Sequence, residues 1–340
     1  MPSRNDLLNN FITHSGWSEA EISMVAGDAS NRKYFRLRQH DNTTAIIMDA
    51  PPEKGEDVRP FVNISTHLSG LGFSAPRILA QDDTAGFLLL EDLGDDLFAR
   101  VLKNDLSKEN RLYSAATTLL ADLHTHPTPE GLGAYSPAVM ADLAALAFDW
   151  YLTQADKKNN AAAQEFRQKM QQVLEDYAPD TNVLIQRDYH AENLLWLPDR
   201  NGTARVGLLD YQDALKGHRA YDLVSLLQDA RRDVSPQVQQ AMLEQYISQT
   251  DVNDTKFRNA YYCLGAQRNL RIVGVFARLC VRDGKAHYVD LIPRVWAHLM
   301  RDLDHPAMAD VATLVRDTLP SPTLETLQRL KDKCATLQTP

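Results

Sequence analysis

The sequence predicts an α+β protein in two unequal parts, a small antiparallel sheet followed by a larger, mainly helical part. Short runs rich in β-branched and aromatic residues, separated by turn residues, fill the first quarter of the chain. Helical periodicity dominates from about residue 97 to the end. The length of 340 residues also exceeds the roughly 100–200 residues that are usual for one domain.

The first part is expected to form a sheet with a covering helix. After an opening helix, the runs EISMV, KYFRLRQ and TTAIIMDA are separated by the turn-like stretches AGDASN and HDN. The segment VRPFVNISTHLSGLG then places Phe61, Ile64 and Leu68 at helical spacing, and Gly70 and Gly72 supply stop signals. The runs PRILAQ and GFLLLED follow as two further strands.

The second part is expected to be mainly helical. The segment KENRLYSAATTLLADLHTH repeats apolar residues at helical spacing and ends at Pro127. Two more helical segments lead to the short strands NVLIQ, NLLWL and ARVGLLD, and the remainder is helical. We therefore predict two lobes, residues 1–92 and residues 93–340, with a cleft between them, which is a common place for a ligand.

Charge and cysteine content exclude several classes of function. The chain has 36 Lys and Arg residues against 45 Asp and Glu residues, so it lacks the basic footprint of a nucleic-acid-binding protein. Cys263, Cys280 and Cys334 form no C-x-x-C pair, which indicates reduced thiols. No apolar run resembles a signal peptide or approaches the ~18 residues of a membrane span. We expect a cytoplasmic protein with no membrane partner, compatible with a monomer.

Two polar loops follow predicted strands in the second part. RDYHAEN contains Asp188 and Asn193, and LLDYQD contains Asp210. Phosphoryl transfer needs a carboxylate that deprotonates the acceptor hydroxyl, and oxygen ligands for the metal that offsets phosphate charge. Asp188 suits the first role, and Asn193 and Asp210 suit the second. Turns favour Asp and Asn in any case, but this ordered set favours a functional reading.

These loops resemble the Brenner motif of the aminoglycoside phosphotransferase-like kinases, relatives of the protein kinases. The resemblance spans roughly residues 25–301 and implies a bilobal protein-kinase-like fold, ATP and Mg²⁺ as cofactors, and the roles of Asp188, Asn193 and Asp210 given above. GHRAYDLVSLL resembles a family segment in which Asp222 braces the catalytic loop. Gln186 stands where the family usually has His, and we expect it to take over that bracing role.

The predicted phosphate site departs from the family pattern. Met48 stands where the third strand of protein kinases carries a Lys, and the position of its Glu partner falls near Phe61. The chain is therefore either a catalytically silent nucleotide-binding protein or a kinase that holds phosphate from elsewhere. The turn GDASNRKYFRL offers replacement groups in Ser30, Asn31, Arg32 and Lys33.

The adenine and acceptor sites are also expected from the resemblance. LLLEDLG matches the interlobe hinge, where the backbone near Glu91 and Leu93 would meet adenine. GDASNRKYFRL, MDAPPE, LLDYQDAL and GAQRNLRIVGVFARL resemble bacterial anomeric kinases of N-acetylmuramate and N-acetylglucosamine in cell-wall recycling. On the last segment we expect Arg268, Asn269 and Arg271 to bind the sugar, since guanidinium suits a carboxylate. An aminoglycoside, choline or homoserine acceptor is the alternative.

Overall fold

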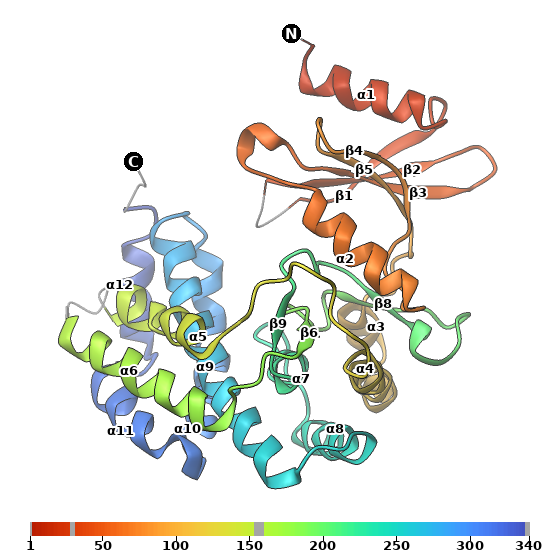
Figure 1. Ribbon diagram of the computed structural model, residues 1–340. Helices are drawn as coiled ribbons and strands as arrows, with labels where there is room; N and C mark the ends of the chain where they lie inside the picture. The colour runs from red at the N-terminus through yellow and green to blue at the C-terminus, as the bar shows by residue number, and fades with distance from the viewer. Residues whose placement is uncertain (1, 28–30, 153–159, 337–340) are drawn as a thin grey trace. The chain divides into compact units, whose positions relative to one another are not determined.

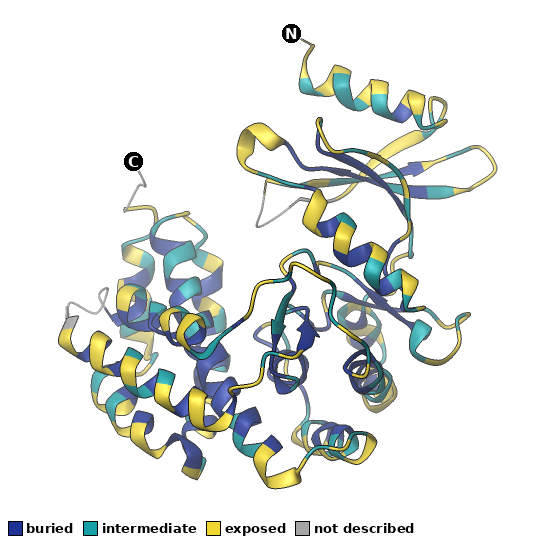
Figure 2. Cartoon of the chain, viewed as in Figure 1, coloured by how far each residue is buried: buried dark blue, intermediate teal, exposed yellow. Residues whose placement is uncertain are grey.

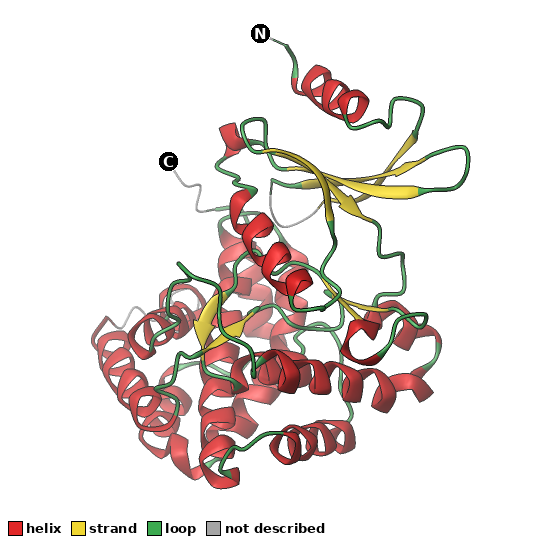
Figure 3. Cartoon of the chain, turned by 45° about the vertical axis from the view of Figure 1, so that its right-hand side comes forward, coloured by secondary structure: helices red, strands yellow, loops and turns green. Residues whose placement is uncertain are grey.

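The computed structural model describes residues 2–27, 31–152 and 160–336, which form two compact units. The first unit comprises Met1–Lys108 and Ala191–Ala214, and the second comprises Glu109–His190 and Leu215–Pro340. Residues 191–214 thus belong to the first unit although they lie between two segments of the second. The first unit is built on a sheet and the second is mainly helical (Figures 1 and 3), which confirms the predicted α+β class.

An antiparallel five-stranded sheet forms the centre of the first unit, in the order β1-β2-β3-β5-β4. Its strands are β1 (Glu21–Gly27), β2 (Lys33–Arg38), β3 (Thr44–Asp49), β4 (Ile78–Asp82) and β5 (Phe87–Glu91). In the β2–β3 register Tyr34 lies opposite Met48, and Arg36 lies opposite Ile46. Because side chains alternate across a strand, these four residues share one face of the sheet.

The two faces of this sheet carry different helices (Figure 1). On one face Leu37, Ala45, Ile47 and Leu89 form an apolar cluster with Ile12 of α1 (Arg4–His14). The helix α2 (Arg59–Gly70) lies on the other side, and its buried residues include the three expected from the helical spacing, together with Ser65. The unit also contains α3 (Phe98–Asn104), β7 (Leu194–Trp196) and β8 (Val206–Leu208).

The second unit is organised around α9 (Asp254–Val281), which is buried along most of its length (Figure 2). A close helix crossing occurs at Gly274, where a side chain would collide with the backbone at Leu146. The other helices are α4 (Glu109–Leu123), α5 (Pro137–Ala144), α6 (Asn160–Tyr177), α7 (Ala220–Leu227), α8 (Pro236–Gln249), α10 (Ile292–Leu303), α11 (Ala309–Thr318) and α12 (Leu324–Asp332). A π-helical turn spans Ala147–Leu152.

A short two-stranded sheet in the second unit leads into the predicted catalytic loop. β6 (Val183–Ile185) pairs with β9 (Leu215–Gly217), and α7 begins three residues after β9. The strand β6 was predicted, but β9 was not. Within the described part of the chain, no helix is both long enough and apolar enough to cross a bilayer.

Candidate functional site

The β7–β8 pair in the first unit brings together two predicted metal ligands. Asn193 directly precedes β7, and Asp210 follows β8 by two residues. Because Leu194 pairs with Leu208 in the antiparallel register, both side chains emerge at the same end of the pair. Asn193 Nδ2 lies 3.4 Å from Asp210 Oδ2. The backbone of Asp210 has φ 58°, a left-handed conformation that is uncommon for a residue with a side chain.

The residues at this end fit a hard divalent cation such as Mg²⁺. They offer carboxylate and amide oxygens, which Mg²⁺ prefers, and Gln212 Nε2 orients the carboxylate by donating to Asp210 Oδ1 over 2.7 Å. The described residues contain no group of three or more His, Cys, Asp or Glu side chains that could hold a metal ion by themselves. A cation here would therefore depend on a nucleotide's phosphate oxygens for further ligands.

A pocket of about 330 Å³ in the first unit adjoins these two residues. Apolar side chains dominate its walls, among them Ile46, Leu90 and Leu209, and Asn193 and Asp210 belong to its lining. Mixed apolar walls with a few polar groups are typical of small-molecule sites.

Glu91 and Leu93, the two residues predicted to meet adenine, both line this pocket. The Glu91 carboxylate is occupied by ion pairs with Arg77 over 3.2 Å and with Arg200 over 2.8 Å. The charge of Glu91 is therefore already balanced within the protein, and its backbone N–H also donates to the Arg77 carbonyl over 2.8 Å.

The predicted phosphate-binding turn lies partly in the described chain. Ser30 lies outside the described residues. Asn31 donates from its backbone N–H to Glu56 Oε1 over 3.1 Å, and Arg32 Nε lies 2.7 Å from Glu56 Oε2. Lys33 is exposed at the start of β2. Arg32 is thus the cation of this turn that the fold holds in place.

Apolar packing fills the positions of the missing Lys and Glu. Met48 is completely buried, and Phe61 stacks on Tyr211 with a ring separation of 5.0 Å. The neighbouring carboxylate, Asp49, is bound by Arg4 of α1, with the Arg4 Nε to Asp49 Oδ1 distance at 2.9 Å. The segment MDAPP therefore supplies packing and an anchor for α1, and no cation.

The predicted catalytic carboxylate lies in the second unit, in the loop after β6. Asp222, in the first turn of α7, accepts the backbone N–H groups of Gln186 over 2.6 Å and Arg187 over 2.9 Å. Arg187 has φ 71°, so the loop is held in a strained conformation directly before Asp188. Burial raises the pKa of Asp222 to about 7, against the opposing effect of the two N–H groups.

Positive charge surrounds Asp188. Burial alone would raise the pKa of its carboxyl, but Arg271, followed by further cations including Arg268, more than offsets this, so the pKa lies below its usual range. Asp188 is therefore ionised at neutral pH although it is half-buried.

The three residues predicted to bind the acceptor lie at different depths in α9. Arg268 is buried and donates to Ser225 Oγ over 2.8 Å, and Asn269 is buried and donates to Asp302 Oδ2 over 3.1 Å. Arg271 is half-buried and donates to the Tyr221 hydroxyl over 3.4 Å. The binding role of all three stays a prediction, and Arg271 is the most accessible of them.

Several residues of these sites were not predicted by the sequence analysis. Tyr34 and Arg36 line the pocket of the first unit, and burial, with the charge of Asp210, raises the pKa of Tyr34 to about 12. Their alternation in KYFRL places both on one face of β2, a signal that was available. Glu56, which binds Arg32, carries no local signal because 24 residues separate the pair.

Comparison with known proteins places this geometry in a family. Residues 21–258 match the model of the phosphotransferase enzyme family. A curated N-acetylmuramate/N-acetylglucosamine kinase of Caulobacter vibrioides is 38% identical over 338 residues, which cover 88% of this chain and 93% of the relative. One of the same name from Pseudomonas aeruginosa is 34% identical over 321 residues, covering 91% and 92%.

Solved structures with low identity share the fold. A choline kinase from Streptococcus pneumoniae has a TM-score of 0.59 at 16% identity, covering 87% of this chain and 99% of its own. An aminoglycoside phosphotransferase bound to gentamicin has a TM-score of 0.60 at 12% identity, covering 92% and 100%. The chain therefore belongs to the phosphotransferase enzyme family of aminoglycoside phosphotransferase-like kinases, and it is an ATP-dependent kinase of small molecules.

Proposed function

We propose that the protein transfers phosphate from ATP to the anomeric hydroxyl of an amino sugar, N-acetylmuramate or N-acetylglucosamine, in cell-wall recycling. The observation that carries the acceptor assignment is the ionised Asp188 carboxylate among arginines of the second unit. The names of the relatives at 38% and 34% identity support the sugar.

Asp188 acts on the acceptor as the general base. An anomeric hydroxyl is more acidic than an ordinary alcohol, so a carboxylate that is ionised at neutral pH suffices to accept its proton. Asp222 keeps the loop in place by binding two of its backbone N–H groups, and Ser225 adds a hydrogen bond to the Arg187 carbonyl over 3.2 Å. These hydrogen bonds fix the backbone of the loop that carries the proposed base.

Arg271 is the group we assign to an acidic acceptor. N-acetylmuramate carries a carboxylate that N-acetylglucosamine lacks, and a guanidinium binds carboxylate with charge-assisted hydrogen bonds. Arg271 is half-buried, and its charge acts on Asp188. An aminoglycoside is a poor fit for such a site, because its ammonium groups would meet this positive charge.

On the nucleotide side, Asn193 and Asp210 would hold Mg²⁺, which when bound offsets the negative charge of the phosphates. Leu93 and the Glu91 backbone are assigned to adenine. Arg32 is the cation we assign to the role of the missing Lys, because Glu56 fixes it as an ion pair over 2.7 Å. An arginine held by a carboxylate would then do in this chain what the Lys–Glu pair does in protein kinases.

The test is ATP consumption by the full chain with a panel of acceptors: N-acetylmuramate, N-acetylglucosamine, kanamycin, choline and homoserine. We expect turnover with the two amino sugars and loss of reducing-end reactivity in the product. Asp188→Asn should lower kcat by at least about 1000-fold while ATP still binds.

Three results would contradict the proposal in different ways. Retained reducing-end reactivity would place the phosphate on another hydroxyl. Turnover of kanamycin, choline or homoserine alone would assign a different acceptor. ATP binding without turnover of any acceptor would indicate the silent nucleotide-binding protein.

A further inference from the structure

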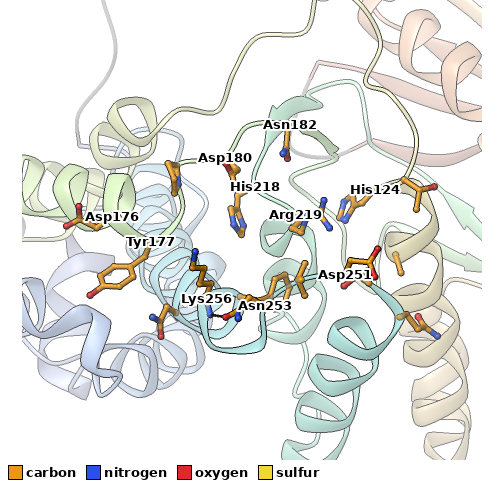
Figure 4. A pocket seen from close by; sticks show the side chains of 18 residues that line it. His124, Asp176, Tyr177, Asp180, Asn182, His218, Arg219, Asp251, Asn253 and Lys256 are labelled. Carbon is orange, nitrogen blue, oxygen red and sulfur yellow. Dashed lines mark hydrogen bonds between the residues drawn. The ribbon is translucent and has the colours of Figure 1, made fainter.

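The second unit contains a cavity of about 860 Å³ whose lining includes none of the residues assigned to catalysis (Figure 4). Five segments converge on it: the ends of α4, α6 and α8, and the starts of α7 and α9. His124 and His218 are its buried polar residues, and Asp180 and Asp251 are exposed at its rim. Its volume lies in the upper range of small-molecule sites.

Two cations line this cavity beside the three exposed carboxylates Asp176, Asp180 and Asp251. Arg219 and Lys256 both line it, and neither forms an ion pair within the described part of the chain. Burial lowers the pKa of His124 to about 3 and that of His218 to about 4, so both imidazoles are neutral. The fixed positive charge of the lining therefore resides on Arg219 and Lys256.

Both cations stand where a helix disfavours them. Arg219 is the N-cap residue of α7, and Lys256 lies in the first turn of α9. The positive end of a helix dipole repels a cation and attracts an anion, so a bound anion would relieve both positions. In addition, His124 Nε2 is buried without a hydrogen-bond partner among the described residues, while Nδ1 is bonded to the Tyr246 hydroxyl over 2.7 Å.

The rim of the cavity has a different chemistry. Asp176, Asp180 and Asp251 are exposed carboxylates, and Asn182 and Asn253 add amides. Carboxylates accept hydrogen bonds from hydroxyls, and amides can both donate to them and accept from them. Figure 4 shows these rim residues distributed around His218 and Arg219. A ligand that satisfies both parts of the cavity carries one anionic group and several hydroxyls.

Two lining segments of the cavity are continuous with elements that hold the catalytic loop. Asn182 directly precedes β6, which runs into Gln186. On the other wall, His218 and Arg219 follow β9 and precede α7, whose Asp222 binds the Gln186 and Arg187 N–H groups. The two strands are paired along their whole length, and they pack closely at Gly217, where a side chain would collide with that of Ile185.

We propose that this cavity is an effector site for a small hydroxylated anion, with the chemistry of a sugar monophosphate, and that its occupancy is transmitted to the catalytic loop through α7. The anionic group binds Arg219 and Lys256, and the hydroxyls bind the rim carboxylates and amides. Any effect on turnover rests on the proposed kinase activity, but binding and its effect on the loop do not.

Binding is tested by calorimetric titration of the full chain with glucose 6-phosphate, glucuronate, inorganic phosphate and neutral glucose. We expect glucose 6-phosphate to bind and glucose not to bind, with glucuronate separating phosphate from carboxylate preference. Arg219→Met should weaken binding at least tenfold. Lys256→Met, at an exposed position that leaves the fold intact, should weaken it several-fold. Arg258→Met is the matched control, since Arg258 lies on α9 outside the lining and pairs with Asp254.

The link to the loop is tested by amide hydrogen exchange, which needs no turnover. We expect bound glucose 6-phosphate to slow exchange at Gln186 and Arg187 in the wild type and in Arg258→Met, but not in Arg219→Met. The effector site is refuted if no charged sugar binds, if glucose binds equally well, or if both lining variants bind as the wild type does. Unchanged exchange at Gln186 and Arg187 on binding overturns the transmission through α7.

Discussion

The pocket of the first unit and the surroundings of Asp188 in the second unit differ in how their arginines are paired. In the first unit the arginines near the pocket are neutralised by carboxylates, as in the pairs Arg32–Glu56, Arg36–Asp92 and Arg200–Glu91. Around Asp188, by contrast, Arg268 and Arg271 are held by neutral oxygens of Ser225 and Tyr221.

Under the proposed assignment of the two sites, this difference decides which groups would balance the charge of each reactant. Because these arginines are already paired with carboxylates, a triphosphate in this pocket would need further positive charge besides Arg32, and on the proposed assignment a metal ion held by Asn193 and Asp210 would supply it. The positive charge around Asp188 keeps its carboxyl ionised, and on the proposed assignment it would also suit an acidic sugar. The predictions below test each side of this contrast, from the largest expected effect to the smallest.

Removing a metal ligand should produce the largest loss on the nucleotide side. Asp210→Asn replaces a charged ligand by a neutral one, so we expect kcat to fall by about 100-fold or more, since metal charge stabilisation is worth several kcal/mol. Raising Mg²⁺ or Mn²⁺ concentration should recover part of the rate. Asp213→Asn, the same change three residues on, is the control. Equal kinetics for Asp210→Asn and the wild type would remove Asp210 from the metal site.

Removing the charge of Arg271 should change the preference between the two amino sugars. We expect Arg271→Leu to lower the ratio of kcat/KM for N-acetylmuramate to that for N-acetylglucosamine by about 10- to 100-fold, the value of one charge-assisted hydrogen bond. Arg278→Leu, two turns along the same helix, should leave the ratio unchanged. An equal loss with both sugars would show that Arg271 does not bind the acceptor's carboxylate.

The same variant has a predicted pH signature. Arg271 lowers the pKa of Asp188, so its removal should raise that pKa. Since the base acts only when ionised, the acidic limb of the kcat/KM profile should move to higher pH with N-acetylglucosamine as acceptor. An unshifted limb would mean that Asp188 does not control it.

The smallest expected effect concerns the two cations of the β1–β2 turn. Arg32→Met should raise the KM for ATP about tenfold, because it removes the ion-paired cation assigned to phosphate. Lys33→Met should change it less than about twofold, because that side chain is exposed and a solvated charge contributes little. The reverse order would assign the phosphate to Lys33.

The sheet, most helices and the polar loops could be predicted because each depends on local patterns. The alternation in KYFRLRQ and TTAIIMDA and the spacing of Phe61, Ile64 and Leu68 report which face is buried, whatever the partner. The strand β9 was missed because LKG has too few residues to show a period. It exists because it pairs with β6, which no local signal reveals.

Partnerships across long sequence separations could not be predicted for the same reason. Nothing in the sequence shows that Glu56 binds Arg32, or that Arg200 binds Glu91 across 109 residues. The sequence also did not show how deeply each residue of α9 is buried. From the sequence, Arg268 and Asn269 were preferred to Arg271 as ligand-binding residues, and only packing shows that they bond to buried neighbours.

The return of Ala191–Ala214 to the first unit has a consequence for how the protein is made. During synthesis the first 108 residues emerge without β7 and β8, so this unit cannot be completed until residue 214 has left the ribosome. By then the first 82 residues of the second unit, 109–190, have also been made. A fragment cut after residue 108 would consequently lack Asn193 and Asp210, and it would be an incomplete unit without its predicted metal ligands.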